Sequence, residues 1–298
     1  MNAPLHAALP LKIRGVSIDP PVVNASGAID PFSPDAAWRC EPEIARMFGV
    51  CVTKTTTIDA REGNPQPWVE LHPHDDQSLI NAVGLANPGI DAVLRRVAQL
   101  QPALGVPVLL SIAGDAAACV ALVNQAERSP QIAGYEVNLS CPNVGGGLIG
   151  ADPEASAGVV AAVRARTERP VIAKLSPASD IARIAVAVER AGADAICAVN
   201  TMPVRAVDDD GQPILGTINA GLSGRLLHPI ALRCVAAVAA VVKIPVIGVG
   251  GVASAAAVRR MFHAGASAVG VGTGGVLDAQ SLSEVITAAG CATSPNML

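Results

Sequence analysis

The sequence predicts an α/β fold, a single (β/α)8 TIM barrel, on three observations. Eight short runs rich in β-branched residues alternate with alanine-rich stretches of helical spacing. No linker or change in composition divides the 298 residues, so one domain is expected over 1–298. Of all residues 51% are hydrophobic but only 2% are aromatic, which suits parallel strands buried beneath helices and packed by small and aliphatic side chains.

The eight runs are expected to be the parallel barrel strands, because each is a short apolar segment bounded by turn-forming residues. They cover residues 22–26, 51–55, 107–112, 135–140, 171–176, 195–200, 245–250 and 268–273. Among the helical stretches between them, Ser254 is a candidate N-cap. Gly192 and Gly265 each stand in an AGA sequence, where a helix can end with a glycine in the left-handed conformation.

Polar or charged side chains end many of these runs. Active sites of this fold lie at the carboxyl ends of the strands, so these side chains should converge on one mouth. They are Ser26, Lys54, Ser111, Asn138, Lys174 and Asn200. Two longer excursions, 56–90 and 201–228, are predicted to be lid insertions over that mouth.

Two glycine-rich segments follow the last two runs, GVGG at 248–251 and GVGTGG at 270–275. Loops in these positions of the barrel commonly bind phosphate, because bare backbone N–H groups face the anion. They predict a phosphorylated cofactor. Two weaker interpretations stay open. In the first, the glycines serve only to permit tight turns. In the second, Gly270, Gly272 and Gly275 form a GxGxxG dinucleotide fingerprint, although only residues 276–298 follow it, too few for the rest of such a fold.

Charge and cysteine content narrow the class of protein. A net charge of −4 and few aromatic side chains argue against nucleic-acid binding and favour a small-molecule substrate. The seven cysteines contain no CxxC pair, so no disulfide framework, zinc site or iron–sulfur site is indicated, and a cytoplasmic location is expected. The apolar run 234–242 stops at Lys243, far short of a membrane span.

Three polar segments are expected to be structural. HPHDD at 72–76 has metal-ligating residue types but lacks a third separated ligand, so a solvated loop is predicted rather than a metal site. VDDDG at 207–211 is predicted to be an exposed turn. Asn87, within NPG, is predicted to be a turn residue.

A series of motifs, in order and spacing, resembles the class 1 dihydroorotate dehydrogenases over about residues 11–278. The two most specific are NLSCPN (138–143) and NAVGLANPG (81–89). The others are VNASG (23–27), TKTTT (53–57), REGNP (61–65), AKLSP (173–177), VNT (199–201), GLSG (221–224), GVGG and GVGT. The resemblance implies FMN-dependent oxidation of (S)-dihydroorotate to orotate in de novo pyrimidine biosynthesis, with FMN bound at the top of the barrel.

Cys141 is the candidate general base. Oxidation of the substrate ring removes a proton from C5 and a hydride from C6, so a base must stand on one side of the ring and the flavin N5 on the other. A free thiol titrates at about pH 8.5 and needs help from its surroundings to act near neutrality. The amides on either side of Cys141 favour catalysis over packing. Packing remains the expectation for Cys51, Cys119, Cys197 and Cys234.

The resemblance assigns the substrate ring to amide side chains, since amides offer both the donors and the acceptors that a cyclic imide requires. The residues implied for the substrate are Asn81, Asn138, Asn143 and Asn200, together with Thr201, Gly84 and Leu85. Lys54 matches a catalytic lysine that lies between flavin and substrate, where it could pair with the substrate carboxylate.

Lys174 matches a lysine beside the N1 and O2 edge of the flavin, where negative charge accumulates on reduction. A lysine at the end of an apolar strand has no packing role, because burial of an unpaired ammonium is costly. The residues implied for FMN contacts are Ala25, Ser26, Gly27, Lys54, Thr55, Asn138, Lys174, Gly224, Gly250, Gly251, Gly272 and Thr273.

Three segments that border the expected pocket depart from the family pattern. They are ASGAIDPF after the first run, Asn219 and Ala220 before GLSG, and MPVRAV after VNT. Two alternatives therefore stay open. One is an FMN-dependent enzyme that acts on a related cyclic amide, and the other is a non-catalytic flavin-binding subunit.

Within class 1 the chain most resembles the NAD-linked subclass, in NAVGLANPG and in the region from DDDGQPILG to GLSG. Resemblance to that subclass implies that this chain is a catalytic subunit, expected to form a homodimer. Such a catalytic subunit passes electrons to NAD through a separate subunit that carries FAD and an iron–sulfur cluster. No membrane partner is implied.

Overall fold

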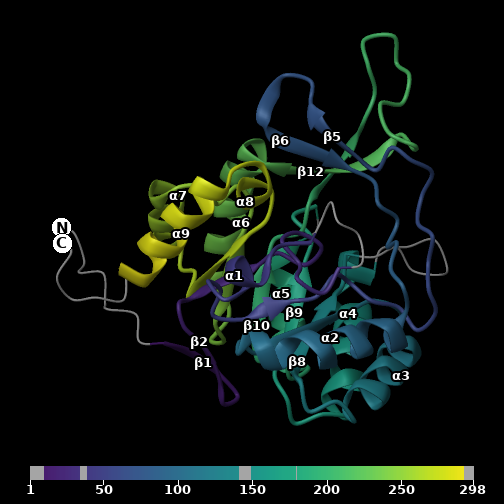
Figure 1. Ribbon diagram of the computed structural model, residues 1–298, viewed down its shortest axis with the longest axis vertical. Helices are drawn as coiled ribbons and strands as arrows, with labels where there is room; N and C mark the ends of the chain where they lie inside the picture. The colour runs from purple at the N-terminus through teal and green to yellow at the C-terminus, as the bar shows by residue number, and fades with distance from the viewer. Residues whose placement is uncertain (1–9, 34–38, 141–148, 179, 292–298) are drawn as a thin grey trace.

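The computed structural model describes residues 10–33, 39–140, 149–178 and 180–291, and its eight-stranded sheet is a closed barrel (Figure 1). The strands are β3 (Val22–Asn24), β4 (Cys51–Val52), β7 (Val108–Ile112), β8 (Ile132–Asn138), β9 (Val171–Leu175), β10 (Ala195–Ala198), β13 (Val246–Val249) and β14 (Ala268–Val271). All neighbours pair in parallel, in the order β3-β14-β13-β10-β9-β8-β7-β4. A parallel bridge between Val23 and Val50 closes the circle. The predicted barrel is confirmed, with one strand in each predicted run.

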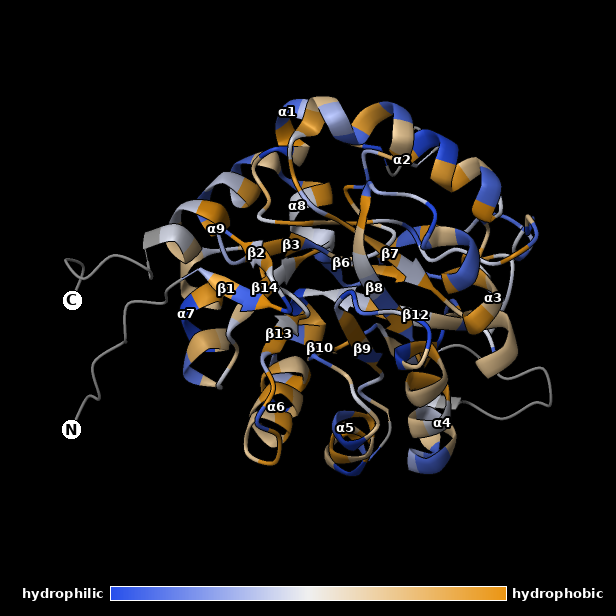
Figure 2. Cartoon of the chain, turned by 90° about the horizontal axis from the view of Figure 1, so that it is seen from below, coloured by the Kyte–Doolittle hydropathy of each residue, from blue (hydrophilic) through white to orange (hydrophobic). Residues whose placement is uncertain are grey.

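Helices connect the strands and surround the barrel (Figure 2). The longer ones are α2 (Ile90–Leu104), α3 (Ala116–Ala126), α4 (Pro153–Arg164), α5 (Ile181–Arg190), α6 (His228–Ala239), α7 (Ala255–His263) and α9 (Ala279–Cys291). The short ones are α1 (Pro42–Ala45), α8 (Thr273–Leu277), and the 3-10 turns η1 (Ile149–Ala151) and η2 (Arg225–Leu227). None of the helices in the described part of the chain is long and apolar enough to cross a membrane.

Local sequence signals account for where several helices begin and end. Side chains that accept backbone N–H bonds at helix starts are Asp115, Asp152, Asp180 and, as predicted, Ser254. Gly192 (φ 99°) and Gly265 (φ 100°) follow α5 and α7 with positive φ, which confirms the predicted glycine endings.

The amino end of the barrel is closed by a hairpin of β1 (Leu11–Ile13) and β2 (Val16–Ile18). Ile13 and Ile18 belong to the apolar cluster that fills the barrel interior, together with Leu109 and Ile172. Arg14, at the hairpin turn, forms an ion pair with Asp194 just before β10. The carboxyl end of the barrel is therefore the end that is open to ligands.

The two predicted lid excursions pair with each other in one four-stranded antiparallel sheet, the lid sheet. Its strands are β5 (Val69–His72), β6 (Asp75–Asn81), β11 (Met202–Arg205) and β12 (Asn219–Gly224), in the order β11-β12-β6-β5. β6 pairs with β12 from Asn81 opposite Gly221 to Ser78 opposite Gly224. Figure 1 shows this sheet at one end of the molecule, beyond the barrel strands.

The segment HPHDD forms the tight connection between β5 and β6, and its solvated-loop prediction is wrong for one residue. Asp75 is 5% exposed, because its carboxylate accepts a hydrogen bond from Ser78 Oγ (2.5 Å) and pairs with Arg225. These contacts lower the pKa of Asp75, the hydrogen bond from Ser78 contributing most. The pair joins the first excursion to the residue that follows β12.

Two turn predictions agree with the structure. In the segment 207–211, Asp208 is exposed and its side chain accepts backbone N–H bonds from Asp210 and Gln212. Asn87 accepts from Gly89 N (2.9 Å) and donates to Leu85 O (2.7 Å), so it holds the turn before α2.

Gly216 tests whether the two excursions act as one unit. A Cβ at this position would lie 1.7 Å from Pro65 O, while Gly216 N donates to Pro67 O at 2.9 Å. Gly216→Ala must separate the excursions without touching the barrel core. We expect faster proteolytic cleavage within 56–90 and 201–224, with little change in far-UV circular dichroism. The control is Gly158→Ala, on α4 with open space around it. Equal cleavage rates in both variants would contradict this coupling.

Candidate active site

A cavity of about 480 Å³ lies at the carboxyl ends of the barrel strands, between these strands and the lid sheet. Every described residue that was predicted to bind the substrate or the cofactor lines it. For the substrate these are Lys54, Asn81, Gly84, Leu85, Asn138, Asn200 and Thr201, and for the cofactor Ala25, Ser26, Gly27, Thr55, Lys174, Gly224, Gly250, Gly251, Gly272 and Thr273. Cys141 and Asn143 lie outside the described residues. The roles of these residues stay predictions.

The cavity is positively charged. Among the described residues that line it, only Lys54 and Lys174 carry a charge, and no acidic side chain is present. Two ammonium groups on a lining whose described residues include no acidic side chain favour anions, all the more strongly where protein excludes water. The cavity is therefore suited to a ligand with negatively charged groups.

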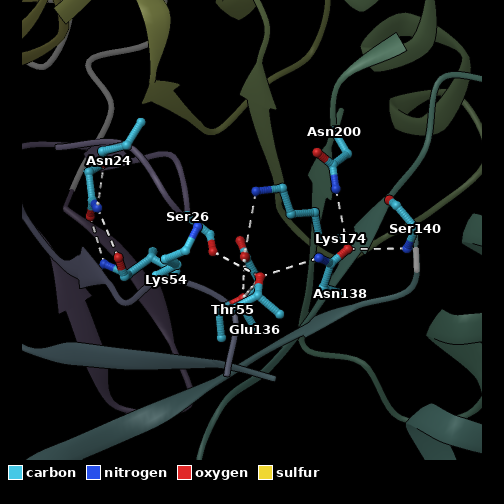
Figure 3. Close-up of polar contacts among 12 residues, drawn as sticks. Asn24, Ser26, Lys54, Thr55, Glu136, Asn138, Ser140, Lys174 and Asn200 are labelled. Carbon is cyan, nitrogen blue, oxygen red and sulfur yellow. Dashed lines mark hydrogen bonds and ion pairs between the residues drawn. The ribbon is translucent and has the colours of Figure 1, made fainter. Parts of the chain in front are cut away.

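Lys174, in β9, is buried and ion-paired from below the cavity (Figure 3). Lys174 is 4% exposed, and its Nζ lies 3.6 Å from Oε1 of Glu136 in β8. Burial, the largest single effect, lowers the pKa of Lys174, but Glu136 and Cys197 together outweigh burial and raise the pKa above the ordinary value. The lysine therefore carries its positive charge at neutral pH.

Hydroxyl groups link Glu136 to the far side of the cavity floor. Ser111 Oγ donates to Glu136 Oε1 (3.1 Å) and lies 3.0 Å from Thr55 Oγ1, which lies 3.2 Å from Ser26 Oγ. Ser111 was expected at the mouth, but it is fully buried and does not line the cavity. That expectation was wrong because the Ser111 side chain turns inward to the carboxylate.

Two of the amides predicted to bind the substrate, both on the barrel, form a hydrogen-bonded pair. Asn200 Nδ2 donates to Asn138 Oδ1 (3.2 Å), which also accepts from Ser140 N (3.2 Å). Asn138 Nδ2 donates in turn to Thr55 Oγ1 (3.3 Å). Asn200 Oδ1 accepts from Thr201 N (2.8 Å). Each amide is thus held in one orientation (Figure 3).

The third of the predicted substrate amides that the structure describes, Asn81, comes from the lid sheet. Asn81 Nδ2 donates to Gly221 O (3.1 Å) across the β6–β12 pair. A Cβ on Gly221 would lie 2.2 Å from Thr201 Oγ1, so only glycine lets the threonine approach. The nearby Gly84 and Leu85 both have positive φ, at 71° and 59°, which turns the chain sharply beside the cavity.

Lys54 is positioned by a buried acid that the sequence analysis did not single out. Lys54 N donates to Asp30 Oδ2 (2.6 Å), and Phe32 N donates to Asp30 Oδ1 (2.8 Å). Asp30 is 1% exposed, and burial raises its pKa to about 6 against the opposing effect of these two N–H bonds. Asp30 therefore anchors the main chain from which the Lys54 side chain enters the cavity.

The glycine end of the cavity is a narrow backbone cradle. Gly250 (φ 126°) and Gly251 (φ 64°) follow β13 with positive φ. A Cβ on Gly251 would lie 2.7 Å from Gly224 O, so no other residue fits there without a shift. Thr273 Oγ1, across the cradle, donates to Ser223 Oγ (2.8 Å). Such bare backbone surrounds phosphate groups in many barrels.

His228, also missed from the sequence, supports this cradle from behind. Arg260 Nε donates to His228 Nε2 (3.1 Å), so the imidazole proton resides on Nδ1 and is donated to Gly250 O at 2.9 Å. The residue is 8% exposed, and burial lowers its pKa. Neutral His228 therefore fixes the carbonyl group of Gly250.

Sequence signals for the missed residues differ in strength. Glu136 stands two residues before Asn138 in an apolar strand, so its side chain lies on the same face of β8. An acid in that position was a readable signal. Asp30 and His228 bond to residues that are distant in sequence, and no local pattern indicates those partners.

Comparisons with known proteins agree with these features. The family model described as dihydroorotate dehydrogenase matches residues 8–288. The dihydroorotate dehydrogenase B (NAD(+)) catalytic subunit of Desulforudis audaxviator is 41% identical over 271 residues, 89% of this chain and 86% of that protein. The proteins of the same name from Geotalea daltonii and Bacillus cereus are 38% and 37% identical over 275 residues, 91% of this chain and 88% and 87% of theirs.

The buried His228 predicts a loss of stability in acid. Its pKa is lowered by folding, so above about pH 6.5, the ordinary value, it is neutral in both states and its stabilising effect is complete. As the pH falls below that value, the unfolded chain binds a proton that the folded chain resists, and stability declines. His228→Asn can still donate to Gly250 O but cannot titrate. Thermal unfolding midpoints from pH 8 to 5 should fall more steeply in the wild type, and parallel curves would contradict this.

Proposed function

Since the chain belongs to the dihydroorotate dehydrogenase family, we propose that it oxidises (S)-dihydroorotate to orotate in pyrimidine biosynthesis, with FMN as its cofactor. The observation that carries the proposal is the cavity at the mouth of the barrel. Its charged lining residues among those described are two lysines, and its amides converge from separate strands. An anionic ring with alternating carbonyl and N–H groups suits such a lining.

The cavity residues fit FMN in two respects. The cradle at Gly250 and Gly251 leaves bare backbone where a Cβ would clash, which suits a phosphate. The buried cation of Lys174 suits the N1 and O2 edge of the flavin ring. We propose that the phosphate is held by Gly224, Gly250, Gly251, Gly272 and Thr273, and the ring by Ala25, Ser26, Gly27, Lys54, Thr55, Asn138 and Lys174. When bound, FMN would supply the acceptor for the hydride that leaves C6 of the substrate.

For the substrate, we propose that Lys54 pairs with the carboxylate while the amides orient the ring. Asn81, Asn138, Asn143 and Asn200 would hold the ring, with Thr201, Gly84 and Leu85 around it. Asn200 and Asn138 already hold each other in fixed orientations, so binding does not have to order them. Asp30 and the lid sheet position Lys54 and Asn81 from opposite sides of the cavity.

Cys141 is proposed as the base that removes the proton from C5. It lies outside the described residues, but Ser140, directly before it, lines the cavity. Ser140 Oγ is buried and has no hydrogen-bond partner among the described residues, so a polar atom is available at this edge. These two facts support a cysteine that enters the cavity from the end of β8.

The relatives are named as catalytic subunits of an NAD-linked enzyme, which implies a partner subunit for them. We propose the same arrangement here, with electrons passed to NAD through a separate subunit that carries FAD and an iron–sulfur cluster. The homodimer, the single domain over 1–298 and the cytoplasmic location stay predictions.

The reaction is tested by anaerobic stopped flow on the purified, FMN-loaded chain. Addition of dihydroorotate should bleach the flavin absorbance of the wild type and of Cys119→Ala, a packing cysteine in α3. Cys141→Ala should keep its flavin but lose about two orders of magnitude or more in the rate of bleaching, the usual effect of removing a general base. Bleaching of Cys141→Ala at the wild-type rate would refute the assignment, and no bleaching of the wild type would refute the reaction.

Electron transfer beyond FMN is tested by steady-state assays of the isolated chain. With dihydroorotate, it should reduce an artificial dye but not NAD, because no group of three or more metal-ligating side chains occurs among the described residues. Fumarate, the electron acceptor of the class 1 subclass that works without a partner subunit, should turn over far more slowly than the dye. Rapid NAD reduction by the pure chain, or fumarate turnover as fast as the dye, would contradict the two-subunit proposal.

A further inference from the structure

Glu136 is a buried acid directly below a cavity that is otherwise positive. Its side chain is 5% exposed and does not line the cavity, whereas Lys174 and Asn138 above it do (Figure 3). A carboxylate removed from water is retained only where charges and hydrogen bonds compensate it. Its partners therefore indicate what it does.

The first partner is the ammonium group of Lys174. Glu136 Oε1 lies 3.6 Å from its Nζ, and Cys197 of the neighbouring strand β10 stands opposite Lys174 in the sheet register. Lys54 is the other ionisable side chain among the described cavity residues. The carboxylate thus lowers the net positive charge at this point of the cavity and keeps the lysine protonated.

The second partner is a hydrogen-bond chain whose direction the carboxylate sets. A carboxylate only accepts, so Ser111 Oγ must donate to Glu136. Ser111 has then used its only hydrogen, so Thr55 Oγ1 must be the donor in the 3.0 Å contact between them, while Ser26, the more distant hydroxyl neighbour of Thr55 at 3.2 Å, gives its own hydrogen to Thr53 O. Thr55 in turn accepts from Asn138 Nδ2. Asn138 Oδ1 then faces Ser140 N and Asn200 Nδ2, which both donate to it.

We propose that Glu136 is the positioning residue of this cavity, which through Lys174 sets the reduction potential of bound FMN and through Ser111 and Thr55 helps to hold Asn138, one of the amides proposed to bind the substrate. This inference rests on the proposed function. Glu136 itself touches neither ligand. Its carboxylate couples the charge beside the flavin to the donor and acceptor pattern beside the substrate.

Glu136→Gln tests the proposed effect on the reduction potential, because the substitution keeps the shape of the side chain and removes its charge. The midpoint potential is measured by spectroelectrochemistry from pH 6 to 9, without substrate. At low pH, where Lys174 keeps its proton, the variant should have a higher potential than the wild type, because the cation is no longer offset. As the pH rises, the buried lysine without its carboxylate loses the proton, and the potential should fall towards that of Lys174→Ala. A wild-type potential throughout this pH range would overturn the inference.

Ser111→Ala tests the proposed effect on the amides, because it breaks the hydrogen-bond chain from Glu136 and leaves the ion pair with Lys174 in place. Its midpoint potential should match the wild type. Its affinity for orotate, followed by the perturbation of the flavin spectrum, should fall on the order of tenfold, the effect of one mis-set hydrogen bond. Unchanged orotate affinity, or a shifted potential, would overturn this part of the inference.

Glu127→Gln is the matched control. Glu127 accepts from Tyr135 OH (2.6 Å) and Thr167 Oγ1 (2.7 Å) and follows α3, at the amino end of the barrel. This variant should lose thermal stability but keep the wild-type potential and orotate affinity. A potential that shifts equally in Glu127→Gln and Glu136→Gln would overturn the specific role. Failure of the proposed reaction is recognised separately, because the midpoint potential is measured without substrate. A chain that binds no FMN would overturn both the proposed function and this inference.

Discussion

A lysine ammonium held out of water at the carboxyl end of the barrel is the constraint on which the site depends. Lys174 is 4% exposed, and an unpaired charge in such a place would be lost or neutralised. Glu136, from the adjacent strand, compensates it from below, which leaves the cavity side of the ammonium available to an anion. The parallel register of β8 and β9 places Asn138 opposite Lys174, so the same pairing positions an amide beside the cation.

The cavity depends equally on segments that are far apart in the chain. Parallel pairing brings together the ends of β3 and β14, the first and last barrel strands in the chain, and the two excursions add Asn81 and Thr201. Gly216 and Gly221 allow these excursions to approach closely. The hairpin at the amino end blocks the opposite opening, so ligand chemistry is confined to one face. A rigid scaffold thus carries a site assembled from its loops and strand ends.

Much of this could be predicted from the sequence, because alternating short apolar runs and alanine-rich stretches determine a barrel, and strand ends determine its mouth. The strands of the lid sheet were not predicted. The β6–β12 pair that joins the two excursions connects residues over a hundred positions apart, and β12 is rich in small residues with weak strand propensity. Asp30, Asp75 and His228 were missed or misjudged for a related reason. Each is buried by partners that only the folded chain supplies.

One cavity is proposed to hold the flavin against Lys174 and the substrate against the amides. A crystal structure of the protein with FMN and orotate is the decisive measurement. We expect the phosphate in the cradle of Gly250 and Gly251, the flavin N1 edge at Lys174, and orotate between the ring and Cys141 with its carboxylate at Lys54. A flavin whose N1 edge points away from Lys174, or orotate bound outside this cavity, would contradict it.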